Sequence, residues 1–412
     1  MWKNLKWGIL GLALTLVIVL SGVIGHTLAE NGNAGGNTSA PGAPPPSQGF
    51  SILDEIYQIL QEDFVDPQQI NPELLRLGAI DGIIQALGDP HTVYIDPQTY
   101  ALGVDIISGS FQGIGAQVEQ DPVSRSIVIV TLFRDSPAEK AGVRSGDVIL
   151  AVDGETTEGW TVTQAVQRIR GAEGTPVTLR VQHRNGEVEE VTVVRETITI
   201  PTVFTRDLTD AAGAPVPEIA YVELQQFTDQ TVQDLSQELR NIGEQGFRAL
   251  ILDLRRNPGG ALSATVDVAD MFLDGGLVLT EVDRFGNETT LSANSGGEAT
   301  GIPMAVLIGP GSASGAEVVA GALRDNGRAT LIGETTFGKG SVNRLRPLSD
   351  GGALYVTIAR WLTPKGEQIE GVGLAPDQVV PLTEEDAIDA ERDDQLFAAI
   401  DFLRQSIIQA TP

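Results

Sequence analysis

Two glycine-rich loops, one with a serine and one with a lysine, carry candidate groups for hydrolytic chemistry in this sequence. The sequence has no Cys and only three His, at positions 26, 91 and 183. Without Cys, a thiol nucleophile and a Cys-based zinc site are excluded. The three His lie far apart in the chain, so we expect no His-rich metal site and no cofactor. A hydrolytic site would therefore use hydroxyl, carboxylate or lysine groups.

The serine lies in Gly311–Glu317, between an apolar run and a predicted helix. Ser314 falls at the expected N-terminus of that helix, where free N–H groups and the helix dipole favour developing negative charge. Ser314 and Glu317 also match the Ser-x-x-Glu capping box. On this pattern alone, a helix cap is the favoured interpretation and a nucleophile is the alternative.

Two further loops follow predicted strands. Phe337–Ser341 places Lys339 between two glycines, and Leu254–Gly260 ends in Asn-Pro-Gly-Gly. The simpler interpretations are a solvated lysine and a Pro-Gly turn. Because α/β sheets build their sites at the carboxyl ends of strands, the position of the three loops favours a shared site.

The region after Ile200-Pro201 predicts α/β crossover architecture. Apolar runs predict strands at 219–224, 249–254, 304–308, 329–332 and 354–358. Helical periodicity predicts helices at 232–242 and 315–325, and one or two acidic helices within 384–409.

Residues 108–196 form a separate β-rich unit in the sequence. Predicted strands cover 115–119, 126–131, 147–152, 177–182 and 188–194, with short helices at 137–141 and 163–170. Phe111–Gly115 followed by SPAEKAGVRSGDVILAVDG resembles a PDZ domain. The resemblance implies that backbone N–H groups of Gly113, Ile114, Gly115 and Ala116 receive a peptide's C-terminal carboxylate, and that the peptide adds as a strand beside 115–119. The alternative is a glycine turn before an edge strand.

The N-terminus predicts export. Lys3 and Lys6 precede an apolar run over 7–25, which is long enough to span a bilayer and favours a retained anchor over a cleaved signal peptide. Residues 30–49 are rich in Gly, Pro, Asn and Ser and predict a flexible tether. Helices are predicted at 52–60 and 72–87, the second capped by Asn71.

Charge narrows the choice of partners. The formal net charge is −28, with 27 Lys and Arg against 55 Asp and Glu. Such a surface repels phosphate backbones, so we expect no nucleic-acid partner. Solubility is the simplest interpretation of the acidic surface.

Together the motifs resemble the carboxyl-terminal processing proteases, tail-specific Ser/Lys endopeptidases of peptidase family S41. The likeness covers nearly all of the chain after the tether. The segments that carry it are Ala79–Gly82, Leu87–Thr92, the PDZ-like unit, Asp253–Gly260, Gly311–Glu317, Phe337–Val342, Ala359–Gly366 and Gly371–Asp377.

The resemblance implies a role for each site residue. Ser314 would be the nucleophile, with Ser312 as the competing choice, and Lys339 the general base. Gly315 and Gly260, with Gly259 as the alternative to Gly260, would supply the oxyanion-hole N–H groups.

Family members usually carry Gln where this sequence has Asn343, an amide whose arm is one methylene shorter. We hypothesise that Lys339 is therefore held less firmly until substrate binds. The base also requires a pKa lowered from about 10.4 to about 7–8, which burial of the amine can supply.

The expected fold is α/β and multidomain. It has a signal or anchor at 1–29, a linker at 30–49, a helical region at 50–107, a PDZ domain at 108–196, and an α/β protease core of crotonase-like, S41 type at 197–412. The expected function is a serine endopeptidase on the extracytoplasmic side of a bacterial cell envelope, acting on proteins with an exposed C-terminus. The alternative is a non-catalytic envelope adaptor with a degenerate core.

Overall fold

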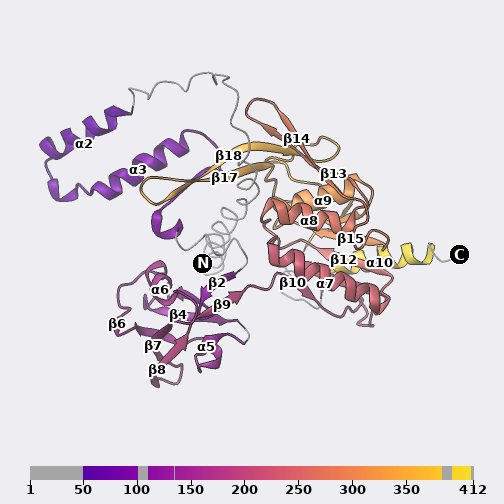
Figure 1. Cartoon of the computed structure of the whole chain (residues 1–412), viewed down its shortest axis with the longest axis horizontal. Helices are drawn as coiled ribbons and strands as arrows, with labels where there is room; N and C mark the ends of the chain where they lie inside the picture. The colour runs from indigo at the N-terminus through magenta and orange to yellow at the C-terminus, as the bar shows by residue number, and fades with distance from the viewer. Residues whose placement is uncertain (1–49, 101–109, 134, 383–391, 410–412) are drawn as a thin grey trace.

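The computed structural model describes residues 50–100, 110–133, 135–382 and 392–409. A helical lead-in, a β-rich module and an α/β core follow one another along the chain (Figure 1), which confirms the predicted fold class. The predicted apolar segment 7–25 and the tether 30–49 lie outside the described residues. Among the residues that are described, no helix has the length and apolar character needed to cross a membrane.

The lead-in is a pair of helices, as predicted. It comprises α2 (Ser51–Asp63), the 3₁₀ turn η1 (Pro67–Gln69) and α3 (Pro72–Gln85). The Asn71 side chain caps α3 by accepting the N–H of Glu73 at 3.0 Å and of Leu74 at 3.2 Å. The chain then enters the core through β1 (Val93–Ile95), which pairs antiparallel with β18 (Ala353–Leu362).

The β-rich module contains one sheet in the order β3-β4-β5-β7-β8, with β6 beside β5. Its elements are β3 (Ala116–Gln120), β4 (Ile127–Leu132), α5 (Pro137–Lys140), β5 (Val148–Val152), β6 (Glu155–Thr156), α6 (Val162–Ile169), β7 (Pro176–Gln182) and β8 (Val188–Val194). The predicted strands and helices of this module differ from the observed ones by no more than one residue at either end. Alternating residues such as Ile127, Ile149 and Leu179 fill its own core.

The two chain ends of the β-rich module form one two-stranded antiparallel ribbon. Strand β2 (Ser110–Gly113) pairs antiparallel with β9 (Glu196–Thr199). Among the strands of the described residues, β3 pairs only with β4, so its other side is a sheet edge beside α6. This arrangement leaves a strand edge to which a peptide could add.

The core is built on a sheet in the order β10-β11-β12-β15-β16-β19, parallel except for β10. Its strands are β10 (Val203–Thr205), β11 (Ile219–Leu224), β12 (Ala249–Asp253), β15 (Met304–Ile308), β16 (Thr330–Gly333) and β19 (Gln378–Val379). Every residue of β12 and β15 is buried, which explains their continuous apolar runs.

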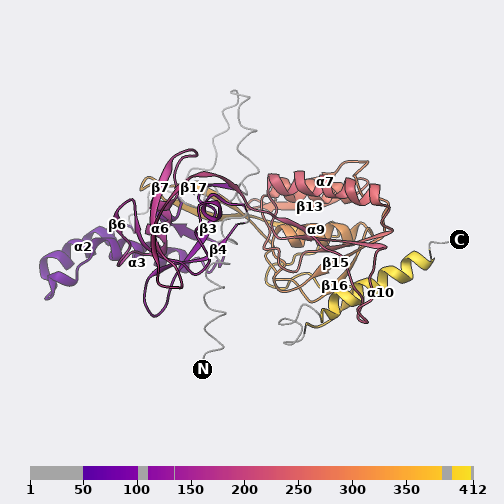
Figure 2. The same ribbon diagram turned by 90° about the horizontal axis from the view of Figure 1, so that it is seen from below.

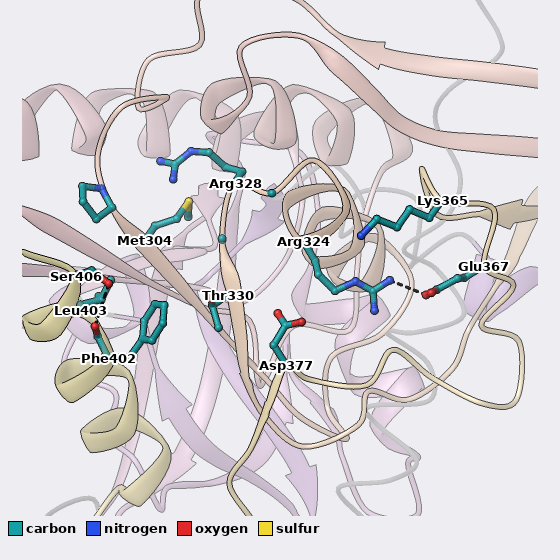
Figure 3. Close-up of a pocket in the computed structure, with 13 residues that line it drawn as sticks. Met304, Arg324, Arg328, Thr330, Lys365, Glu367, Asp377, Phe402, Leu403 and Ser406 are labelled. Atoms are coloured by element: carbon teal, nitrogen blue, oxygen red, sulfur yellow. Dashed lines mark hydrogen bonds and ion pairs between the residues drawn. The ribbon is translucent and has the colours of Figure 1, made fainter. Parts of the chain in front are cut away.

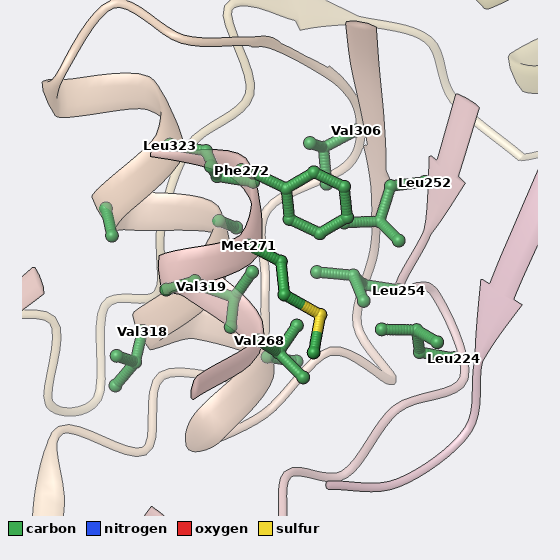
Figure 4. Packing of buried hydrophobic residues seen from close by; sticks show 14 of the residues in the cluster. Leu224, Leu252, Leu254, Val268, Met271, Phe272, Val306, Val318, Val319 and Leu323 are labelled. Atoms are coloured by element: carbon green, nitrogen blue, oxygen red, sulfur yellow. The ribbon is translucent and has the colours of Figure 1, made fainter. Parts of the chain in front are cut away.

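Alternate side chains of this sheet face two separate cores. Leu252 and Val306 pack with α7 (Asp229–Gln245), α8 (Leu262–Phe272) and α9 (Gly315–Asp325), as Figure 4 shows for part of this cluster. Ile251 and Leu307 pack instead against α10 (Asp394–Gln409). Figure 2 accordingly shows α7 and α10 on opposite sides of the sheet.

A second sheet has the order β1-β18-β13-β14, with β17 also paired to β18. Its remaining strands are β13 (Gly276–Asp283), β14 (Glu288–Ala293) and β17 (Ser341–Pro347). The sequence did not predict α8, β13, β14 or β17. In β17 the cause is composition, because Arg344 and Arg346 interrupt the apolar alternation of a half-buried strand.

Candidate active site

Ser314 occupies a strained turn between β15 and α9. Its φ is 53° and its ψ −114°, a conformation that costs a non-glycine residue about 1–3 kcal/mol. Two hydrogen bonds hold the turn: the Ala313 N–H donates to the Asn257 carbonyl at 3.0 Å, and the Ser314 N–H donates to Glu317 Oε2 at 2.8 Å. Ser314 is partly exposed, so a substrate can reach it.

Ser312, the competing serine, is fully buried. Its Oγ donates to the Leu254 carbonyl at 2.8 Å and accepts the Gly309 N–H at 3.1 Å. These bonds tie the loop after β12 to the loop after β15. The geometry gives Ser312 a structural task and favours Ser314 as the reacting hydroxyl.

Lys339 lies between β16 and β17 and is only 2% exposed. Its Nζ is 5.5 Å from the centre of the Tyr355 ring, and its carbonyl accepts the Trp361 indole N–H at 3.1 Å. Burial lowers the pKa of Lys339 to about 8, the direction that a general base requires. Ser314 and Lys339 line the same cavity of about 30 Å³, so the loops after β15 and β16 do converge.

Three carboxylates partly offset this effect of burial. Glu370, Glu317 and Asp89 each raise the pKa of Lys339. Glu370 is itself paired, with Oε1 2.9 Å from His91 Nε2 and Oε2 2.8 Å from an Arg360 guanidinium nitrogen. The lead-in thus contributes Asp89 and His91 to the surroundings of the lysine.

Glycines on two loops near Ser314 carry the backbone N–H groups that are the candidates for an oxyanion hole. The Gly259 N–H donates to Asn257 Oδ1 at 2.8 Å, and the Gly259 carbonyl accepts the Phe227 N–H at 3.0 Å. Gly260 forms a parallel bridge with Phe227, and a Cβ there would lie 2.1 Å from the Phe227 carbonyl oxygen. Gly260 and Gly315 line the Ser314 cavity, and Gly315 is the first residue of α9, whose N–H has no intrahelical acceptor.

Asn343 also lines this cavity, from strand β17. Its Nδ2 donates to the His91 carbonyl and to Thr357 Oγ1, each at 3.0 Å, and its Oδ1 accepts from Ser341 Oγ at 3.3 Å. The side chain is therefore held between the lead-in and the second sheet. That Asn343 orients Lys339 stays a prediction.

The loop Gly113–Ala116 lies where β2 passes into edge strand β3. The carbonyls of Ile114 and Gly115 accept backbone N–H groups of the module at 2.9 and 3.0 Å. A trans peptide holds its N–H opposite its carbonyl, so the N–H groups of Gly115 and Ala116 point away from these partners. The loop therefore has the geometry to receive an anion at the end of the β3 edge.

A larger cavity of about 640 Å³ lies beside Met304 and Thr330, at the opposite ends of β15 and β16 from Ser314 (Figure 3). Its Arg324 is paired with Glu367 at 2.6 Å, and its Arg328 donates to carbonyls of the core. Ser406 and Lys365 both line this cavity but lie on opposite sides of it in Figure 3, and Ser406 Oγ donates to the Phe402 carbonyl at 3.1 Å. The Ser314 cavity is therefore the stronger candidate for the active site. Within the described ranges, no group of three or more His, Asp or Glu side chains could hold a metal ion.

Sequence reasoning missed two features of the site. Glu317 was interpreted only as a cap, although it also accepts N–H groups of Gly338 and Lys339. His91 and Glu370 were not connected, because they are 279 residues apart and only the fold brings them together. Glu317 is the third residue of its helix, and its local sequence carries no signal of its partners in the loop of Lys339.

Comparison with known proteins identifies the three parts of the chain. Residues 218–380 match Peptidase family S41, residues 128–183 match a PDZ domain, and residues 26–99 match the N-terminal domain of the activating protease CtpB. The PDZ match lies inside the β-rich module, and the S41 match covers most of the α/β core.

Similar curated proteins cover most of the chain. A carboxyl-terminal-processing protease of Synechocystis is 36% identical over 361 residues, which is 86% of this chain and 83% of that protein. The carboxy-terminal processing protease CtpA of Bacillus subtilis is 34% identical and covers 83% of this chain and 72% of its own length. Among solved structures, a photosystem II D1 C-terminal processing protease aligns at 28% identity and a TM-score of 0.46, over 81% of this chain and 94% of its own. With a PDZ module, an S41 core and curated relatives matched along most of their length, the chain belongs to the carboxyl-terminal processing proteases of peptidase family S41.

Proposed function

We propose that this protein is a serine endopeptidase in which Ser314 is the nucleophile and Lys339 the general base. The observation that carries the proposal is the shared cavity: a reachable serine at a strained helix start and a buried lysine of lowered pKa line the same space. Strained backbone and shifted pKa values concentrate at functional sites.

The proposed reaction proceeds by acyl transfer. Neutral Lys339 takes the hydroxyl proton as Ser314 Oγ attacks the peptide carbonyl carbon, and the Gly260 and Gly315 N–H groups stabilise the oxyanion. The Gly259 N–H already donates a hydrogen bond to Asn257 Oδ1, which favours Gly260 as the oxyanion-hole residue. Lys339 then protonates the leaving amine, the C–N bond breaks, and water hydrolyses the acyl-enzyme with Lys339 again accepting a proton.

The PDZ module would select substrates by their C-terminus. The outward N–H groups of Gly115 and Ala116 and the open edge of β3 support binding of a peptide tail as an added strand. A peptide with an apolar last residue should bind the protein at least about tenfold more tightly as the free acid than as the amide, because charge-assisted hydrogen bonds are the stronger kind. Fluorescence anisotropy of the matched pair measures this ratio, and equal affinities would contradict the proposed mode of selection.

Turnover of an unfolded protein tests the activity itself. The full chain should cleave an unfolded reporter that ends in such a tail, and more slowly the same reporter with its tail amidated. Absence of cleavage with normal tail binding would favour the alternative, a non-catalytic adaptor. The presence of both Ser314 and Lys339 argues against that alternative, since an abandoned site would need neither.

The predicted N-terminal segment supports a location on the extracytoplasmic side of a bacterial cell envelope, with exported proteins as substrates. Export would place Ser314 on the same side as those substrates. Protease accessibility of the intact chain in spheroplasts tests this location, and a wholly protected chain would contradict it.

Asn343 offers a separate test of how the base is held. Asn343→Gln should raise basal cleavage of a reporter that lacks a good tail, because a longer amide reaches further toward Lys339, whereas Asn343→Ala should lower cleavage of every substrate. Pre-steady-state acylation rates compare them. A wild-type rate and pH midpoint in both variants would show that Asn343 does not orient the base.

A further inference from the structure

Glu317 joins the loop of the nucleophile to the loop of the base. It is fully buried in the first turn of α9. Besides the Ser314 N–H on Oε2, its carboxylate accepts three hydrogen bonds from the loop that carries Lys339. These come from the Lys339 N–H to Oε2 at 2.9 Å, the Gly338 N–H to Oε1 at 2.7 Å, and Thr336 Oγ1 to Oε1 at 2.5 Å.

The hydrogen-bond donors around Glu317 favour the ionised form of its carboxyl group. Each Glu317 oxygen faces two donors, and three of the four are backbone N–H groups that can only donate. Thr336 Oγ1 in turn accepts the Leu374 N–H at 2.7 Å, so its own proton is available for Glu317. Four donors match the four acceptor positions of an ionised carboxylate. Burial raises the pKa of Glu317 above its usual value, and these four hydrogen bonds oppose that rise.

A helix cap would need only the first of these contacts. Of the other three, the two from the Gly338 and Lys339 N–H groups fix the peptide planes on both sides of Gly338, directly before the lysine, and the third binds the Thr336 hydroxyl. This segment has further supports: the Phe337 N–H donates to the Ser312 carbonyl at 3.0 Å, and the Gly338 carbonyl accepts the Gly371 N–H at 2.9 Å. The Glu317 carboxylate therefore binds the backbone of the nucleophile and of the base together.

We propose that Glu317 is a positioning residue that holds Lys339 in register with Ser314 through one shared carboxylate oxygen, and that its charge helps to set the protonation of the base. The inference rests on the proposed roles of Ser314 and Lys339. It assigns no contact between Glu317 and substrate. A displacement of about 1 Å between two reacting groups can lower a rate about 100-fold, so a device that fixes their spacing has a large effect on catalysis.

The charge of Glu317 acts on the lysine together with its other neighbours. The acidic groups that face Lys339 are Glu317, Glu370 and Asp89, of which Glu370 is paired with His91 and Arg360. Removing one negative charge from this set favours the neutral lysine. A neutral Glu317 variant should therefore shift the acidic limb of the rate profile to lower pH, while the lost register lowers the plateau.

Glu317→Gln in the full chain tests both the positioning role and the effect of the charge. The amide keeps the size of the side chain but removes its charge, and its N–H₂ group faces two hydrogen-bond donors. We expect kcat for the unfolded reporter to fall about 100-fold with KM little changed, and the acidic limb of the kcat profile to move to lower pH. The matched control is Asp325→Asn at the last turn of the same helix. Asp325 is also buried and accepts a backbone N–H, that of Lys365 at 3.0 Å, but lies away from the cavity. Its kcat and pH profile should stay at wild-type values.

The outcomes separate the inference from the function on which it rests. Wild-type kcat and pH profile in Glu317→Gln, with Ser314→Ala inactive, would overturn the positioning role alone. Equal losses of kcat in Glu317→Gln and Asp325→Asn would show that Glu317 has only a structural role and would contradict the inference. Should Glu317→Gln fail to fold, Thr336→Val removes one of the four donors and keeps the charge; a several-fold loss of kcat with an unchanged pH midpoint would support the inference, and unchanged kcat would contradict it.

Discussion

Replacing Ser314 with Ala should reduce peptide hydrolysis by at least about 10⁴-fold, because removing the nucleophile of a covalent mechanism leaves only binding and oxyanion stabilisation. The fold should survive, since Ala keeps the backbone N–H that donates to Glu317. The free energy of unfolding should change by no more than about 1 kcal/mol. Single-turnover cleavage of the unfolded reporter and denaturant titration measure the two effects.

Ser312→Ala is the matched control two residues away. It should retain most of the activity, because the Ser312 hydroxyl donates to the Leu254 carbonyl and accepts the Gly309 N–H, and does not line the cavity. Loss of this buried hydroxyl should cost about 1–3 kcal/mol of stability. The reverse pattern, an active Ser314 variant and an inactive but folded Ser312 variant, would move the nucleophile to Ser312.

Replacing Lys339 with Met should abolish activity and yet stabilise the protein near neutral pH. As general base and acid, the lysine should account for at least about 10³-fold of the rate. Its pKa is about 8 in the folded chain and about 10.4 when unfolded. A buried ammonium therefore destabilises the fold at pH 7 by up to about 3 kcal/mol, and an apolar side chain of similar length removes that cost.

The pH dependence gives the sign of this effect. Below pH 8 the lysine is charged in both states, and the full cost is present. Between pH 8 and about 10.4, Lys339 is neutral in the folded protein but still protonated in the unfolded chain. The free-energy cost of burying its ammonium therefore falls as the pH rises and reaches zero near about pH 10.4. The advantage of Lys339→Met in denaturant titrations should thus be largest at pH 7 and vanish near pH 10.5. An advantage that does not change with pH, or a loss at pH 7, would contradict a buried lysine of lowered pKa.

Much of the fold follows from local sequence patterns. The strands Ile219–Leu224 and Met304–Ile308 and the helix Gly315–Asp325 coincide with the predictions, because buried parallel strands read as unbroken apolar runs and Ser314 marks a helix start. Of the second sheet, only β18 was predicted, as a shorter strand at 354–358. Its strand β17 carries arginines and packs one face only, so its stability comes from pairing with β18 rather than from its own composition.

The site was predictable in its parts but not in its connections. Glycine-rich loops after apolar runs point to Ser314 and Lys339, and family resemblance gives their roles. The residues that bury Lys339 could not be identified from the sequence, since Tyr355 and Trp361 come from a strand of the second sheet. The same holds for Glu317, whose cap motif is local while three of its four partners are about 20 residues away in the chain and adjacent only in the fold.

Phosphonylation of the full chain by a fluorophosphonate over pH 6 to 10 tests the Ser314–Lys339 dyad most directly. Mass spectrometry locates the adduct, and the time course gives its rate at each pH. The account predicts a single adduct on Ser314, with a rate that rises with pH up to about 8, levels off above it, and is lost in Lys339→Met. An adduct on another residue, or an equal rate in the Lys339→Met variant, would contradict a serine nucleophile activated by a buried lysine.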